Sequence, residues 1–134
     1  MDNTILFSGT PDDVFSEFYN NSHLAGRYTA YIRGVRCETY DGFLKEYSAA
    51  FQFPSYFGEN WNAWYECALD LYWLSFTSLA VVIDDYDMLF TKENDPDNAK
   101  TLFIKDMVDL QKYWQEEKGV ICKVAIFSSQ SHDG

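Results

Sequence analysis

The stretch of sequence that decides the fold is Ser78-Leu79-Ala80-Val81-Val82-Ile83, a continuous apolar run of strand length. A run without polar interruptions predicts a strand that is buried on both faces. Such strands are typical of parallel sheets, in which helices cross over between successive strands. The run therefore predicts an α/β protein.

Outward from this run, strand patterns alternate with helix patterns. Residues 28–32 and 120–127 are rich in β-branched, aromatic and aliphatic side chains and are predicted to be strands. Helical spacing of apolar residues predicts helices over about 39–51, 60–73 and 97–118, and a short helical turn over 84–90. Together these elements predict a small three-stranded parallel sheet packed with helices, and the pattern leaves the order of the strands open.

The first 27 residues are predicted to be an N-terminal extension with a short strand-like stretch and a helix. Thr10 is suited to cap that helix and Pro11 to begin it, and Val14, Phe15 and Phe18 share one of its faces. The predicted organisation is an extension over 1–27, a domain over 28–128 and a loose tail over 129–134.

Charge and cysteine content limit the partners. The chain carries a formal net charge of −11, which repels nucleic acid and anionic membranes and attracts basic proteins, although acidity also serves solubility alone. It lacks an apolar run of the ~18 residues that a membrane helix needs, and no signal peptide is visible. The three cysteines are isolated, which argues against a disulfide framework and against zinc. We therefore expect a cytoplasmic protein without a cofactor.

Residues 53–71 carry the most information about function in the sequence. On a helical wheel, one stripe of the helix after Asn60 faces the core, and it consists of Trp61, Trp64, Cys67, Ala68 and Leu71. The opposite side is predicted to hold Asn62, Glu66, Leu69 and Trp73, with Tyr65 on the border.

The outer side of this helix combines an amide, a carboxylate and a phenol. Asn62 and Glu66 are four residues apart, so their side chains stand together, and Tyr56 and Gly58 precede them in the loop. A carboxylate beside aromatic rings is suited to a cationic pocket of a partner. The alternative is an ordinary solvated helix face.

Residues 54–67, PSYFGENWNAWYEC, resemble the segment Pro-x-Tyr-(aromatic)-Gly-Glu-Asn-x-Asp-Ala-x-x-Asp-Cys of the barstar family. The order of strands and helices over about 28–128 is similar too. The resemblance implies a barstar-like fold and a non-enzymatic inhibitor, an immunity protein that blocks the active site of a basic extracellular ribonuclease such as barnase.

Matching positions imply which residues bind the partner: Tyr56, Gly58, Asn60, Asn62, Tyr65 and Glu66. Glu66 corresponds to the family's main carboxylate, which occupies a phosphate pocket of the nuclease. The chain departs from the family pattern twice, since Asn62 replaces an aspartate and Glu66 is one methylene longer than the expected aspartate. A different basic partner that is not a ribonuclease is therefore an alternative.

A second alternative is an enzyme. Asp84, Asp85 and Asp87 follow the apolar strand, and ligand sites of parallel sheets gather at the carboxyl ends of strands. Carboxylates there can hold Mg²⁺ for a hydrolytic reaction. Capping and turn formation explain the same aspartates without any metal.

Overall fold

The computed structural model of the chain describes residues 26–54 and 60–127. The predicted tail, and the extension apart from its last two residues, lie outside the described part. The strands and helices are, in chain order, β1 (Arg27–Arg33), α2 (Tyr40–Ala50), α3 (Trp61–Asp70), β2 (Ser78–Asp84), α4 (Pro96–Lys112) and β3 (Ile121–Ile126).

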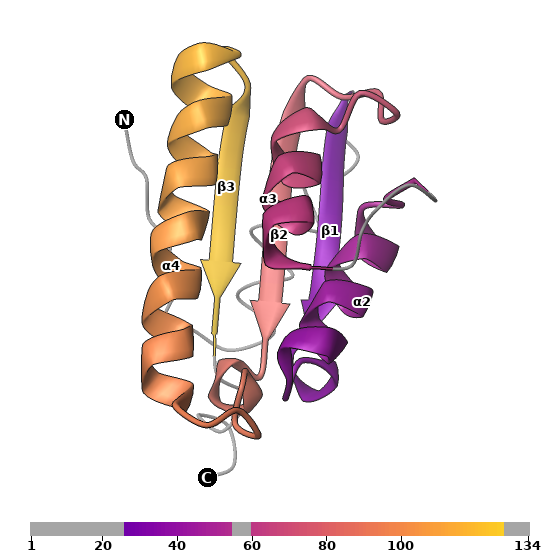
Figure 1. Cartoon of the computed structure of the whole chain (residues 1–134). Coiled ribbons are helices and arrows are strands. Elements are labelled where there is room, and N and C mark those ends of the chain that lie inside the picture. The colour runs from indigo at the N-terminus through magenta and orange to yellow at the C-terminus, as the bar shows by residue number, and fades with distance from the viewer. Residues whose placement is uncertain (1–25, 55–59, 128–134) are drawn as a thin grey trace, which may run out of the picture.

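The strands form one parallel sheet in the order β1-β2-β3 (Figure 1). The apolar run is the central strand β2, which pairs with both neighbours. Ala30 lies opposite Val81, and Val81 lies opposite Val124. The predicted three-stranded parallel α/β fold is confirmed, and the structure supplies the strand order that the pattern left open.

The three α-helices of the described residues, α2, α3 and α4, lie on one face of this sheet (Figure 1). Crossovers between parallel strands are almost always right-handed, and strands placed side by side in chain order then put every crossover on the same side. The helices and the inward side chains of the strands form the main core. The opposite face of the sheet carries no described helix.

Capping side chains and left-handed backbone conformations set the ends of the helices. Thr39 accepts a hydrogen bond from the backbone of Gly42 and begins α2, as predicted. The predicted end of α3 at Trp73 is wrong, because Leu71 adopts a left-handed conformation (φ 50°) and ends the helix at Asp70. The last predicted helix continues from α4 into a π-helical turn, Tyr113–Glu117, shortly before Gly119 at φ 65°.

The core is crowded with aromatic rings. Phe43 is fully buried, and its ring contacts five others, those of Tyr47, Trp61, Trp64, Phe90 and Phe103. Leu102 of α4 lies outside this core, since 49% of its surface is exposed.

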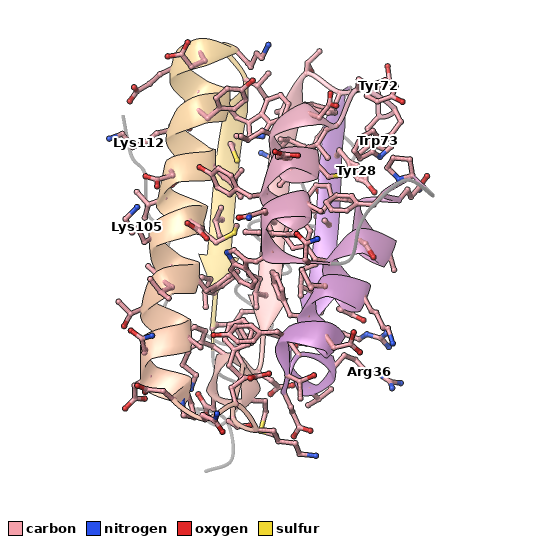
Figure 2. The ribbon with its side chains drawn as sticks, in the orientation of Figure 1. Tyr28, Arg36, Tyr72, Trp73, Lys105 and Lys112 are labelled. Atoms are coloured by element: carbon pink, nitrogen blue, oxygen red, sulfur yellow. The ribbon has the colours of Figure 1, made fainter. Side chains whose placement is uncertain are left out.

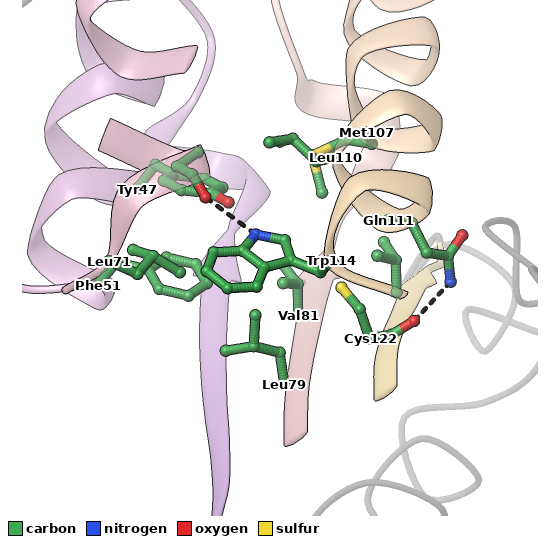
Figure 3. Close-up of a pocket in the computed structure, with 12 residues that line it drawn as sticks. Tyr47, Phe51, Leu71, Leu79, Val81, Met107, Leu110, Gln111, Trp114 and Cys122 are labelled. Atoms are coloured by element: carbon green, nitrogen blue, oxygen red, sulfur yellow. Dashed lines mark hydrogen bonds between the residues drawn. The ribbon is translucent and has the colours of Figure 1, made fainter. Parts of the chain in front are cut away.

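The interior between the sheet, α3 and α4 is filled (Figure 3). Its cavity measures about 10 Å³, which barely accommodates one water molecule. Two hydrogen bonds join residues that line it. The Trp114 indole N–H donates to the carbonyl of Ala68 at 3.1 Å, and the Gln111 amide donates to the carbonyl of Cys122 at 2.8 Å. This part of the core therefore serves packing and offers no room for a ligand.

Within the described residues, none of the helices has the length and apolar character to cross a bilayer. The three cysteines are free thiols, and all three are buried.

Candidate partner-binding face

Helix α3 is held firmly from its inner side. Asn60 caps it, since its Oδ1 accepts a hydrogen bond from the Ala63 backbone at 2.8 Å. Trp64 is fully buried beneath the helix, and Cys67 and Ala68 are buried with it. The predicted inner stripe is thus confirmed for these three residues and for the buried Leu71, while Trp61 at the first turn is only half-buried.

The outer side of α3 presents three of the predicted contact residues together. Asn62 and Glu66 are exposed and one helical turn apart, and Tyr65 beside them is half-buried. These three residues are referred to below as the α3 face. The side chains of Asn62 and Glu66 form no hydrogen bond or ion pair with any other residue in 26–54 or 60–127. Tyr56 and Gly58 lie outside the described residues.

Carboxylates surround Tyr65. Burial raises the pKa of its phenol first, and the nearby charges of Asp109 and Asp106 raise it further, with a small opposing effect from Lys105. Tyr65 therefore stays neutral at physiological pH and can donate a hydrogen bond. The same two aspartates belong to α4 and add negative charge near Tyr65.

Asp106 also fixes α3 against α4. The indole N–H of Trp61 donates to Asp106 Oδ2 at 2.7 Å, a charge-assisted bond between the two helices. Lys105 pairs with Asp109 at 3.3 Å, and Lys105 and Lys112 lie along the outer edge of α4 (Figure 2). Sequence patterns missed Asp106, because which residue of one helix lies beside a given residue of another is decided by packing.

Two residues predicted to lie on the outer side of α3 lie elsewhere. Leu69 is half-buried and packs against the main core. Trp73 follows the end of the helix, so the wheel does not apply to it, and its indole N–H donates to the carbonyl of Phe51 at 2.8 Å. The exposed surface of α3 is consequently narrower and more polar than the wheel predicted.

The aspartate at the end of β2 serves the structure of the chain. Asp84 accepts hydrogen bonds from the backbone of Gly34 at 2.8 Å and from the hydroxyl of Tyr31 at 2.6 Å. Gly34 has no substitute here, because a Cβ atom would approach the carbonyl oxygens of Asp84 and Asp85 to 2.3 Å. Among the residues that the structure describes, no group of three potential metal ligands comes together. The carboxylate of Asp84 instead ties β2 to the end of β1.

Fold and site together define a small three-stranded α/β protein that presents a carboxylate, an amide and a phenol on one outward-facing helix. The family model described as Barstar (barnase inhibitor) matches residues 27–126, from the first residue of β1 to the last of β3. The chain belongs to the barstar family, whose members are inhibitors and not enzymes. A comparison with characterised proteins found no relative of significant sequence similarity.

Proposed function

We propose that this protein is a stoichiometric inhibitor of a basic ribonuclease, an immunity protein that places the α3 face in the active site of the nuclease. The observation that carries the proposal is the match of residues 27–126 to the barnase-inhibitor family, in a chain that keeps a carboxylate at position 66. In this role the protein performs no reaction and needs no cofactor.

The chemistry of Glu66 suits this task. Its carboxylate is exposed and has no described partner, so its hydrogen-bonding capacity is available to a nuclease. A ribonuclease holds the phosphate of its substrate with Arg, Lys and His side chains, and a carboxylate satisfies the same donors with charge-assisted bonds. Glu66 would therefore occupy the position of a substrate phosphate.

The surroundings of Glu66 supply the remaining parts of an inhibitory surface. Tyr65 offers an aromatic ring and Asn62 an amide, and aromatic side chains next to a desolvated charge are typical of binding hot spots. Tyr56, Gly58 and Asn60, just before the helix, complete the proposed contact set. The net charge of −11 accelerates the encounter with a basic partner through long-range attraction.

Asn62 favours a second candidate. Where the family pattern has an aspartate, this chain has a neutral amide, which removes one charge from the face. A barstar-like protein with that change is suited to a basic partner with a different pocket, including one that is not a ribonuclease.

Titration of a basic barnase-type ribonuclease with the purified protein tests the proposal. We expect activity to fall linearly to an end point at a ratio of 1:1. Glu66→Gln removes the charge and keeps the shape, and truncating one partner of a buried charge pair costs about 2–5 kcal/mol, so the inhibition constant should rise about 30-fold to a few thousand-fold. Asp41→Asn is the matched control, since Asp41 is also an exposed carboxylate, on α2, and it should change the constant less than about threefold.

An unchanged inhibition constant in Glu66→Gln would remove that residue from the mechanism. Absence of inhibition by the natural protein and by Asn62→Asp, together with affinity capture of a basic protein devoid of ribonuclease activity, would decide for the second candidate.

A further inference from the structure

The second face of the sheet is apolar at its centre. Side chains alternate along each strand, and the helix-covered face takes Ala30, Val81 and Val124. The opposite face takes the next row of the register, in which Tyr31 lies opposite Val82, and Val82 lies opposite Ala125.

This second face is buried although no described helix lies on it. Ala80, Val82 and Ala125 have 0% exposed surface and Phe127 has 4%. They form a cluster of their own, whose members belong to the strands or directly follow β3, with Tyr31 packed against them. The buried apolar side chains of α2, α3 and α4, apart from Cys67, belong to the other cluster. Parallel sheets are normally covered on both faces, so an additional element must lie here.

We propose that the N-terminal segment, residues 1–25, docks on the second face through its apolar stripe Val14, Phe15 and Phe18. The two other segments outside the described residues are poor occupants. Residues 128–134 read SSQSHDG and contain no apolar side chain large enough to cover the face. Residues 55–59 join α2 to α3, which both lie on the opposite side of the sheet.

The N-terminal segment fits the second face in size. A helix of about nine residues beginning at Pro11 measures ~14 Å, and strands of six or seven residues span ~20–23 Å. Ala80 and Ala125 are the small side chains of this cluster, and large rings such as those of Phe15 and Phe18 can pack against them. Small residues that face large ones give the close packing of protein interiors.

Charge favours the same pairing. Residues 1–25 contain Asp2, Asp12, Asp13 and Glu17 and neither Lys nor Arg. Arg27 and Lys123 stand on the second face at its margins. The segment also precedes the family match, which begins at Arg27, so the proposed docking is a feature of this chain beyond the part shared with the family.

Nuclear Overhauser spectroscopy of the full chain with labelled alanine methyl groups tests the docking directly. We expect contacts from the methyl groups of Ala80 and Ala125 to aromatic protons of the N-terminal segment. These contacts should disappear selectively in Phe15→Leu or Phe18→Leu, two changes that keep an apolar side chain at the position. Contacts to the tail or to a second copy of the chain, or no contact with residues 1–25, would overturn the proposal.

Urea unfolding gives an independent measurement. Phe18→Asp places a charge in the proposed interface and should lower the midpoint by about 1–2 M. Ser16→Asp introduces the same charge on the opposite side of the predicted helix and should leave the midpoint within about 0.3 M of the parent value. Equal midpoints for the two variants would contradict the docking, whatever the stability of the sheet.

Discussion

Substitution of Asn60 by alanine tests how the chain holds the helix that carries the α3 face. Asn60 Oδ1 accepts the backbone hydrogen bond of Ala63 at 2.8 Å. This bond satisfies one of the four N–H groups that every helix leaves unpaired at its first turn. Alanine removes the acceptor and cannot replace it.

The expected loss in the free energy of unfolding is about 1 kcal/mol, within the range of 0.5–2 kcal/mol for N-cap asparagine. The entropy of unfolding for 134 residues near 60 °C is about 0.28 kcal/mol/K. Asn60→Ala should therefore lower the melting temperature by about 3–4 °C, and the urea midpoint by about 0.5 M. Circular dichroism during thermal and urea unfolding measures both quantities.

Two control variants isolate the capping bond. Asn60→Asp keeps the acceptor and adds a negative charge at the positive end of the helix, so it should be as stable as the parent or more so. Asn62→Ala truncates the same kind of side chain two residues later, where it is exposed and has no described partner, and should change the melting temperature by less than about 1 °C. If Asn60→Asp loses as much stability as Asn60→Ala, or if Asn62→Ala does, the capping argument is refuted.

Three further predictions concern the domain as a whole. Burial opposes ionisation of Glu46, but its hydrogen bonds with Arg33 and the charge of Arg33 lower its pKa below 4.5 overall. The stability that this pair contributes is therefore present above pH 4.5 and is lost as the pH falls through the lowered pKa. The difference in urea midpoint between the parent and Glu46→Gln should consequently vanish at acid pH. Burial raises the pKa of Cys37 and of Cys122 to about 12, so a thiol reagent at pH 8 should label neither until urea unfolds the protein, and rapid labelling would contradict the packing. Phe43→Ala empties the centre of the aromatic core and should lower the free energy of unfolding by about 3–5 kcal/mol, whereas a loss below about 1.5 kcal/mol would show that the rings do not pack as described.

Sequence patterns predicted the strands well, because the signal is local. The run Ser78–Ile83 contains almost only apolar residues, and that composition is meaningful only for a strand covered on both sides. The N-caps Thr39 and Asn60 depend on a local signal too, since an N-cap bond joins residues three apart. Helix ends that depend on backbone conformation were not predictable: nothing in the residue type of Leu71 announces its left-handed turn.

The residues of the candidate site also fall into a part that local spacing predicts and a part that depends on packing. Asn62, Tyr65 and Glu66 share one side of a helix because of its 3.6-residue period, so their proximity follows from spacing alone. Asp106 and Asp109 are some forty residues away in the chain, and only the packing of α4 against α3 brings their charges to Tyr65. Asp84 shows that residues close together in the sequence need not form a site. It belongs to a local cluster of aspartates, but its carboxylate binds the backbone of Gly34 and so connects β2 to the end of β1.

What the sequence determined by itself is thus the set of elements, the parallel sheet and the residues of the α3 face. Each depends on the periodicity or composition of one short segment. The tertiary structure decided the order of the strands, the acidic surroundings of Tyr65 and the burial of both faces of the sheet. Those properties arise where segments distant in the chain meet, and the free energy that selects them belongs to the contacts between elements.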